Sequence, residues 1–359
     1  MKKLFIFILL LVIMCKGLYA EQQPQPRIIG GENIEIYRVP WQVLVGEYCG
    51  GVIIAPNFIL TAAHCLRLTT TSVYAGITNR AEATYRNRFF IYRAIPHPYA
   101  DIALLQLESD IPLNRYRWLI NYRASADYAH YAIGNWASAS GWGWTMPGDR
   151  PTPADYLQAV NLQIISNQAA SDALMQQGFP GLAPHEMAAT GGGTNGRQGT
   201  CIGDSGGPLV SFFVGEPVLI GITARGVDWC IGDNQTSPSV FERVSYILDW
   251  INKYVCTRSF TNQYIDRNLV LAACDDLEIR NVTVTNGARL STLYPVDNNI
   301  KLRDVFITNG AALTLNAVRN IYLYNVTIAE NSRLILSAGG DIVIDGYLDI
   351  HLGAEFEMR

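Results

Sequence analysis

The stretch CIGDSGGP, residues 201 to 208, places one serine between an aspartate and a pair of glycines. Such a run has an ordinary explanation as a turn, because glycine supplies positive φ and Asp and Ser side chains bond to the nearby main chain. It also has a chemical explanation, in which the hydroxyl of Ser205 is a nucleophile. Other segments of the chain are needed to decide between the two.

Two upstream segments contain the residue types that a nucleophilic serine requires. TAAHC, residues 61 to 65, contains His64, and DIALLQL, residues 101 to 107, contains Asp101. Hydrolysis by serine needs an imidazole that takes the hydroxyl proton and a carboxylate that fixes the tautomer of that imidazole. Taken singly, His64 is explained as a core histidine and Asp101 as a strand-end cap, but in combination with Ser205 they predict a hydrolytic site.

Two further motifs make this pattern specific, namely IIGG at residues 28 to 31 and SGWG at residues 140 to 143. With TAAHC, DIAL and GDSGGP in this order, the chain resembles the chymotrypsin/trypsin family of serine proteases from Ile28 to about Cys256. The resemblance implies a serine endopeptidase of two β-barrels that acts on protein or peptide substrates without a cofactor or a metal. The short apolar runs of this region, divided by Gly, Pro and Asn, favour the same all-β class.

The resemblance also implies a role for each residue of the site. His64 is the general base, Asp101 orients it, and Ser205 is the nucleophile. The main-chain N–H groups of Gly203 and Ser205 form the oxyanion hole. Glycine at position 203 lets the substrate oxygen approach the main chain without a side chain in between.

Asp204 predicts a mode of activation, because a buried carboxylate beside the nucleophile is costly unless a cation meets it. In the family that cation is a new α-ammonium, which here would be that of Ile28 after cleavage behind Arg27. The ammonium is charged at neutral pH. We therefore expect a zymogen whose activation propeptide is EQQPQPR, residues 21 to 27, and an activating protease that cuts after Arg.

The resemblance places the floor of the specificity pocket at Gly199 and its walls at Thr200, Gly226 and Ser239. Trypsin-like members carry Asp at the floor, whereas glycine offers no charge. An uncharged slot accepts large apolar or aromatic side chains, so we expect cleavage after such residues. Asp228 is the opposing feature, because a carboxylate that enters the pocket from the side favours Lys or Arg.

One segment of the chain departs from the family pattern. The usual Ser-Trp-Gly of the substrate-binding strand reads Ala224, Arg225, Gly226. The loss of serine removes a polar neighbour of the catalytic Asp. The exchange of Trp for Arg predicts that the next subsite is cationic rather than aromatic.

The N-terminus predicts export. Lys2 and Lys3 precede an apolar run from Leu4 to Met14 and a small residue at Ala20, the pattern of a signal peptide over residues 1 to 20. No segment predicts a membrane span. The chain has 27 basic and 31 acidic residues, and removal of Lys2, Lys3 and Lys16 leaves 24 basic residues and a net charge of -7. Nucleic acid is therefore excluded as an expected partner, and the protein is expected to be secreted.

Six cysteines remain after the signal peptide, and an even number in an exported chain predicts disulfides. Six cysteines allow 15 connectivities. The family resemblance implies one bridge between Cys49 and Cys65 and another between Cys201 and Cys230. Cys256 and Cys274 are then expected to join the end of the protease domain, residues 28 to 256, to the segment that follows.

Residues 257 to 359 have a different pattern. Similar segments begin at residues 277, 300, 321 and 342, each with alternating apolar residues and with Asn, Gly or Asp at the turns. This repeat predicts a small β-solenoid of four coils, although a β-sandwich of similar strands is an alternative. The N-V-T sequences at Asn281 and Asn325 fit glycosylation acceptors and also turn-forming asparagines.

Three functions are compatible with the whole chain. The first is a secreted serine endopeptidase. The second is a catalytically weak, protease-like binding protein, although the sequence retains every member of the triad. The third is an adhesin in which the solenoid carries the role, either through a binding face or as a display element.

Overall fold

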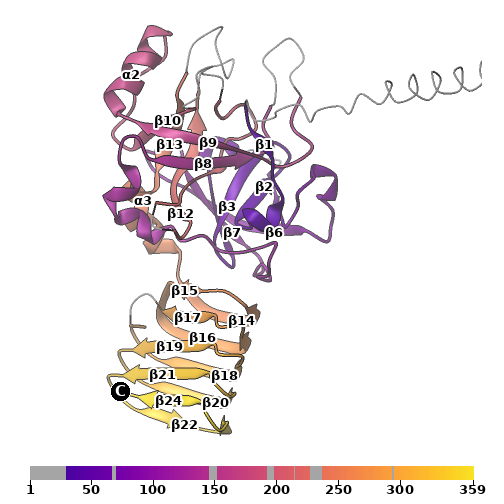
Figure 1. Ribbon diagram of the computed structural model, residues 1–359, viewed down its shortest axis with the longest axis vertical. Helices are drawn as coiled ribbons and strands as arrows, with labels where there is room; N and C mark the ends of the chain where they lie inside the picture. The colour runs from indigo at the N-terminus through magenta and orange to yellow at the C-terminus, as the bar shows by residue number, and fades with distance from the viewer. Residues whose placement is uncertain are drawn as a thin grey trace, which may run out of the picture.

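Two β-barrels and a β-solenoid follow one another along the chain in a computed structural model of the protein (Figure 1). The structure describes residues 30–66, 70–144, 152–191, 198–213, 215–226, 237–292 and 295–359. The predicted signal peptide and activation propeptide, with Arg27 and Ile28, lie outside the described residues. The all-β fold class, with two barrels followed by a solenoid, is confirmed.

The first barrel is closed and antiparallel, with strand order β2-β3-β4-β7-β6-β5. Its interior is filled by β-branched and leucine side chains such as Val43, Ile53, Ile59 and Leu105, all fully buried. The strands are β2 (Gln42–Val45), β3 (Cys49–Ala55), β4 (Phe58–Thr61), β5 (Ser72–Ala75), β6 (Arg88–Pro96) and β7 (Ala103–Leu107), and the short 3-10 helices of this half are η1 (Ile36–Arg38), η2 (Ala63–Cys65) and η3 (Arg80–Glu82).

The second barrel has the order β9-β10-β13-β12-β11-β8 and closes through the pairing of β8 with β9, while β1 (Glu32–Asn33) lies on its edge. Helix α3 packs its buried face, Val244, Ile247 and Ile251, into the core that the two barrels share. The remaining elements are β8 (Trp136–Gly141), β9 (Gln158–Ile165), β10 (Glu186–Thr190), β11 (Pro208–Ser211), β12 (Val218–Arg225), β13 (Ser239–Arg243), η4 (Arg123–Ala126), η5 (Tyr128–Tyr131), α2 (Asn167–Gln176) and α3 (Val244–Tyr254).

The solenoid stacks its coils as two parallel sheets, in the orders β14-β16-β18-β20-β22 and β15-β17-β19-β21-β24. Leu277 pairs with Ile300 and Ile300 with Ile321, so the coils follow the spacing of the sequence repeat. Its strands are β14 (Thr257–Ile265), β15 (Leu269–Leu271), β16 (Ala273–Val284), β17 (Arg289–Thr292), β18 (Ile300–Ile307), β19 (Ala312–Ala317), β20 (Ile321–Ile328), β21 (Arg333–Ala338), β22 (Ile342–Ile344), β23 (Leu348–Ile350) and β24 (Glu355–Met358).

The solenoid has one coil more than the sequence repeat predicts. Strands β14 and β15 form a coil before the four predicted ones, and Phe260 of β14 pairs with Ile279 of β16. The offset between these two residues is shorter than the 21 to 23 residues of the later coils. The segment also lacks the Asn-Val-Thr-like core of the repeat, so local similarity did not reveal it.

Stacked asparagine and aspartate residues make the corners of the coils. Asn262, Asn281, Asp304 and Asn325 have φ of 56°, 52°, 52° and 55°, a conformation that Asn and Asp adopt more easily than other non-glycine residues. The Asn281 amide donates to Asn262 Oδ1 at 2.8 Å, and the Asn325 amide donates to Asp304 Oδ1 at 2.9 Å. Both N-V-T asparagines therefore have a turn-forming role.

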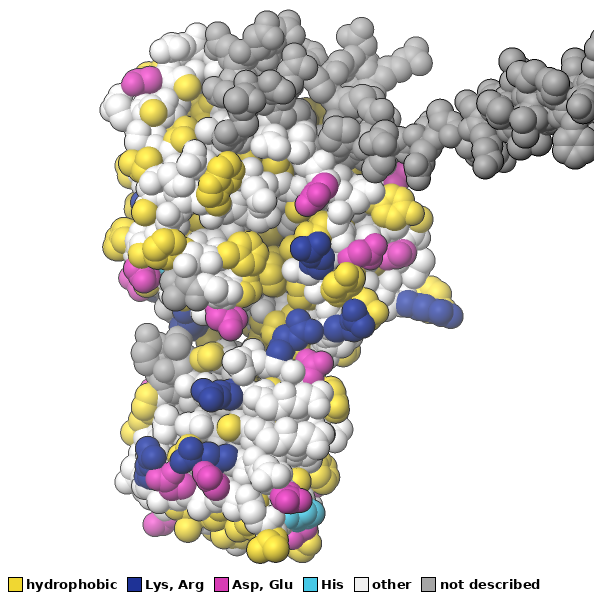
Figure 2. Space-filling view, in the orientation of Figure 1, with side chains coloured by type: hydrophobic (Ala, Val, Ile, Leu, Met, Phe, Trp, Pro, Cys, Tyr) yellow, Lys and Arg dark blue, Asp and Glu magenta, His cyan; other side chains and the backbone are white. Residues whose placement is uncertain are grey.

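The outer face of the solenoid carries charges of both signs. Figure 2 shows acidic and basic side chains next to one another on it. Arg303 pairs with Glu278 of the preceding coil at 3.5 Å, and Arg333 pairs with Glu355 of the following one at 3.0 Å. These exposed pairs link neighbouring coils, and each contributes little to stability.

The segment between β7 and η4 packs against the solenoid and connects it to the first barrel through non-covalent contacts. Leu113 and Trp118 belong to the hydrophobic core of the solenoid, and Leu113 N–H donates to Gln263 Oε1 at 2.9 Å. The Arg267 guanidinium carbon lies 4.9 Å from the centre of the Trp118 ring. A disulfide between Cys256 and Cys274 closes the first coil. No helix among the described residues has the length and apolarity to cross a membrane.

Replacement of Trp118 by alanine is expected to destabilise the protein by about 3 to 5 kcal/mol, because it opens a cavity where the solenoid core meets the barrel. Trp118 is 5% exposed, whereas Trp136, at 52%, provides the matched control. Calorimetric unfolding of Trp118→Ala and Trp136→Ala tests this expectation. Equal stability of the two variants would contradict a shared core at this junction.

Candidate active site

His64 and Asp101 form a directly bonded pair at the edge of the first barrel. His64 lies in η2, which follows β4, and Asp101 lies just before β7, the strand paired with β4. His64 Nδ1 and Asp101 Oδ2 are 2.6 Å apart, and the His64 main-chain N–H donates to Asp101 Oδ1 at 2.8 Å. Both carboxylate oxygens therefore hold the histidine, and no described residue makes a hydrogen bond to its Nε2.

The pKa of the Asp101 carboxyl reflects two opposing effects. Burial raises the pKa, but hydrogen bonds from the side chain and main chain of His64 outweigh burial and leave the pKa below its ordinary value. Asp101 is thus held as a carboxylate. The side chains of His64 and Asp101 are 43% and 34% exposed, so the pair lies open to solvent and to a substrate.

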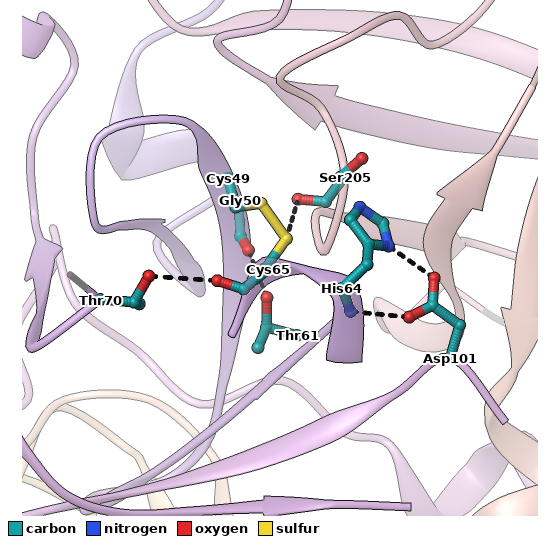
Figure 3. Close-up of a disulfide and its surroundings, with 8 residues drawn as sticks. All are labelled: Cys49, Gly50, Thr61, His64, Cys65, Thr70, Asp101 and Ser205. Carbon is teal, nitrogen blue, oxygen red and sulfur yellow. Dashed lines mark hydrogen bonds and ion pairs between the residues drawn. A yellow bond between two sulfur atoms is a disulfide. The ribbon is translucent and has the colours of Figure 1, made fainter. Parts of the chain in front are cut away.

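Ser205 comes from the second barrel, on the loop before β11. Its main-chain oxygen accepts the N–H of Gly50 at 2.8 Å and lies 3.7 Å from Sγ of Cys65, the neighbour of His64. Figure 3 draws the imidazole with Asp101 on one side and Ser205 on the other. The structure therefore brings together the three residues that the sequence motifs nominated.

The disulfide between Cys49 and Cys65 lies next to His64 and Ser205 (Figure 3). Its sulfur atoms lie within 4.8 Å of a ring nitrogen of His64. They are covalently joined to each other, so they do not offer thiolate ligands to a metal ion. The bridge instead fixes the histidine segment to β3.

The amides of Gly203 and Ser205 are available to a ligand. Within the described residues, neither N–H donates to a protein acceptor. Gly203 has φ of 97°, and a Cβ at this position would lie 3.0 Å from Gly143 Cα. A side chain is excluded there by conformation and by space, which leaves the two amides exposed for an oxyanion.

Asp204 is a fully buried carboxylate behind this loop. Its Oδ1 accepts the N–H of Gly143 at 2.8 Å, and its Oδ2 accepts the N–H of Cys201 at 2.9 Å. Burial raises the pKa of Asp204 to about 7, although these two hydrogen bonds oppose the shift. No ion pair to Asp204 is present among the described residues, and Ile28, its predicted partner, lies outside them.

Three of the four predicted pocket residues lie together. The N–H of Thr200 donates to Ser239 Oγ at 2.9 Å, and a Cβ on Gly199 would lie 3.1 Å from the same oxygen. Apart from its neighbours in the chain, no atom of the described residues would lie within 4 Å of a Cβ on Gly226. Asp228 and Cys230 lie outside the described residues, and Cys201, the predicted partner of Cys230, is disulfide-bonded.

The sequence predicted a cationic subsite at Arg225, and the structure shows instead that the charge of Arg225 is paired. Its guanidinium pairs with both oxygens of Glu186, at 2.7 and 2.8 Å, and donates to the main-chain oxygen of Gly181 at 3.0 Å. A buried carboxylate thus compensates the charge of Arg225. The sequence contained no local signal for this pair, because the partners are 39 residues apart on different strands.

The sequence also gave no sign of a carboxylate directly behind Asp101. Glu242 of β13 is 1% exposed and accepts the main-chain N–H of Asp101 at 3.0 Å through Oε1. Its Oε2 lies 2.8 Å from Nδ1 of His185. The sequence FERVSYILDW around Glu242 predicts a strand followed by a helix and gives no indication of a contact with the triad.

The protease region of the chain is similar to known proteins. The family model described as Trypsin matches residues 28–251. The chain belongs to the trypsin family. Mouse kallikrein-1 is 32% identical over 266 residues, which cover 68% of this chain and 96% of that protein. Renal glandular kallikrein of Mastomys natalensis is 31% identical over 268 residues, 69% of this chain and 97% of that protein.

Human transmembrane protease serine 5 is 32% identical over 243 residues, which cover 63% of this chain. The chain spans only 51% of the length of that relative. The family match agrees with the two-barrel architecture. This trypsin-family chain is a serine endopeptidase.

The pKa of Asp204 predicts how the stability of the uncut chain varies with pH. Its value of about 7 lies above the ordinary 3.8, so between these values the folded state keeps a proton that the unfolded state has lost. Stability from this group is therefore lost as pH rises from about 4 to 7, by up to about 4 kcal/mol. Denaturant unfolding of the Ser205→Ala chain with and without Asp204→Asn is the test. A pH dependence that Asp204→Asn leaves unchanged would contradict it.

Proposed function

We propose that the protein is a secreted serine endopeptidase, made as a zymogen, with His64, Asp101 and Ser205 as its catalytic triad. The observation that carries the proposal is the bonded His64–Asp101 pair of one barrel next to the Ser205 loop of the other. The trypsin-family match and the kallikrein relatives support the same class of reaction. The N-terminal sequence and the disulfides support secretion.

In the proposed mechanism, Ser205 Oγ attacks the carbonyl carbon of the scissile bond while His64 Nε2 takes the hydroxyl proton. Asp101 holds Nδ1–H, which fixes the tautomer and stabilises the imidazolium that forms. The amides of Gly203 and Ser205 bind the oxyanion. His64 then gives the proton to the leaving amine as the C–N bond breaks, which leaves an acyl ester on Ser205. In deacylation His64 takes a proton from a water molecule that attacks the acyl carbon, and it returns this proton to Ser205 Oγ as the ester bond breaks and the carboxylic acid product leaves.

The proposed activation step is cleavage after Arg27, which would release the α-ammonium of Ile28. The buried Asp204 carboxylate supports it, because a full charge at this place needs a cation. The main-chain oxygen of Gly30, two residues after Ile28, accepts the amide of Gln198 at 3.0 Å. The chain just after the proposed cleavage site therefore lies close to the segment that leads into the nucleophile loop.

The proposed specificity is for large apolar or aromatic residues before the cleaved bond. Gly199 places no charge at the floor, and the hydroxyl of Ser239 is already bonded to the Thr200 amide. A bound Lys or Arg would be desolvated without an ionic partner at the floor. An aromatic or aliphatic side chain gains roughly 1.5 to 3 kcal/mol from burial.

Labelling with an organophosphonate probe before and after limited trypsin treatment tests the proposed activity. We expect the uncut chain to react slowly and the chain cut after Arg27 to react at least tenfold faster, because only the cut chain provides the ammonium for Asp204. Ser205→Ala should take up no probe. Arg27→Gln should remain slow after treatment, and Arg27→Lys, which trypsin still cuts, is its matched control.

Equal labelling of cut and uncut wild-type protein would contradict activation at Arg27. Absence of labelling in every form would contradict the protease function and favour the alternative of a protease-like binding protein or an adhesin.

Profiling of the activated enzyme on a peptide library tests the specificity. Cleavage after Phe, Tyr, Leu or Met is expected to dominate. Gly199→Asp, which adds a carboxylate at the floor, should shift the preference toward Lys and Arg. Dominant cleavage after Lys or Arg by the wild-type enzyme would contradict the apolar pocket, and Asp228→Asn would then show whether that side chain is responsible.

A further inference from the structure

The two halves of the triad belong to different barrels. His64 and Asp101 lie on the first barrel, and Ser205 lies on the second. Proton transfer between His64 and Ser205 requires the two barrels to keep their relative position, since an error of about 1 Å costs on the order of 10²-fold in rate. Direct bonds between the barrels at the triad are therefore relevant to catalysis.

Glu242 makes such a bond. It lies on β13 of the second barrel, and its Oε1 accepts the main-chain N–H of Asp101 on the first barrel at 3.0 Å. The two residues are 141 positions apart in the chain. The bond holds the residue that orients His64, and it leaves both carboxylate oxygens of Asp101 for the histidine.

The other oxygen of Glu242 is held within the second barrel. His185, just before β10, lies with Nδ1 2.8 Å from Oε2, and its ring contacts the ring of Tyr246 of α3 in a tilted arrangement, with 5.8 Å between the ring centres. Because a carboxylate only accepts, His185 presents Nδ1–H to it. Glu242 is thus anchored to one barrel at Oε2 and contacts the other at Oε1.

A second buried glutamate, Glu186, lies beside Glu242 in the barrel but makes different contacts. Glu186 pairs with Glu242 across β10 and β13, yet its carboxylate binds Arg225 rather than the Asp101 segment. Burial of a carboxylate is costly, whereas an apolar side chain would fill the same space at no such cost. His185 contacts one oxygen of Glu242, and the Asp101 N–H gives a reason for a second acceptor oxygen at this position.

We propose that Glu242 is a positioning residue, which aligns the His64–Asp101 pair with Ser205 by fixing the main chain of Asp101 to the second barrel. The proposal rests on the proposed triad, since it assigns Glu242 a role through Asp101. Glu242 does not touch the substrate. Its loss should therefore affect the chemical step and leave substrate binding unchanged.

Three substitutions at position 242 test the proposal on the activated full-length enzyme. Glu242→Gln keeps an oxygen acceptor for the Asp101 N–H and removes the charge. Glu242→Asp keeps the charge and withdraws the carboxylate by one methylene. Glu242→Leu removes the acceptor. His130→Ala is the control for lost stability, because His130 is a buried histidine of the second barrel whose Nδ1 lies 3.1 Å from Ser211 Oγ, away from the triad.

We expect Glu242→Leu and Glu242→Asp to lower kcat at least tenfold with KM within twofold of wild type, and Glu242→Gln to stay within threefold in both. His130→Ala should lower the unfolding temperature without this loss of kcat. If Glu242→Leu does not fold, the comparison of Asp with Gln still decides. The proposal is overturned if Gln is as impaired as Asp, since an acceptor at this position would then not preserve kcat. It is also overturned if every folded variant without the acceptor in place, Asp alone or Asp and Leu, retains wild-type kcat.

Failure of the proposed triad gives a different result from failure of this proposal. If Ser205 is not the nucleophile, activated wild-type enzyme does not react with the organophosphonate probe. If only the role of Glu242 is wrong, wild-type enzyme reacts and the position-242 variants react at the same rate.

Discussion

The hydrogen bond from Gly50 N–H to the main-chain oxygen of Ser205, at 2.8 Å, joins the nucleophile loop of one barrel to the wall of the other. The loop is packed so closely that a Cβ at Gly206 would lie 2.2 Å from Thr61 Oγ1 and 2.4 Å from Gly50 O. The glycines of GDSGGP are therefore needed for this approach, and not only for a turn. Because the loop can sit this close, Ser205 reaches the segment that carries His64.

Buried carboxylates organise the region around this contact. Asp204 is held by the amides of Gly143 and Cys201, and a Cβ on Gly143 would lie 2.5 Å from the Asp204 carboxyl carbon. Glu242 is held by the Asp101 amide and by His185. Both groups are costly to bury, so both make the fold depend on particular donors. In our proposals the first carboxylate couples the site to cleavage of the chain, and the second couples the two barrels.

The solenoid depends on a different constraint, the repeated burial of one apolar side chain above another in parallel register. Leu277, Ile300 and Ile321 stack in successive coils, and all three are fully buried. The first coil continues this core onto Leu113 and Trp118 of the protease region. The solenoid is thus an integral part of the folded chain, and its outer face of mixed charge remains solvent-exposed (Figure 2).

The sequence by itself determined the features that are encoded in short, ordered segments. Through their resemblance to the trypsin family, TAAHC, DIAL and GDSGGP implied the two-barrel fold and nominated the residues of the site. The 21- to 23-residue period predicted the solenoid, because each coil repeats the same local pattern. The first coil, β14 and β15, could not be predicted in this way because its stacking depends on register with β16 and not on similarity of sequence.

Only the tertiary structure decided how the buried charges are paired. Arg225 forms an ion pair with Glu186, which lies 39 residues away in the chain, and Glu242 accepts a hydrogen bond from Asp101, which lies 141 residues away. A single glutamate in a strand carries no local mark of its partner, since closure of a barrel decides which side chains face one another. A buried charged group then needs hydrogen-bonding partners, and the residues that barrel closure brings next to it provide them. That requirement acts only in the folded protein, which is why the contact behind Asp101 could not be predicted from the sequence.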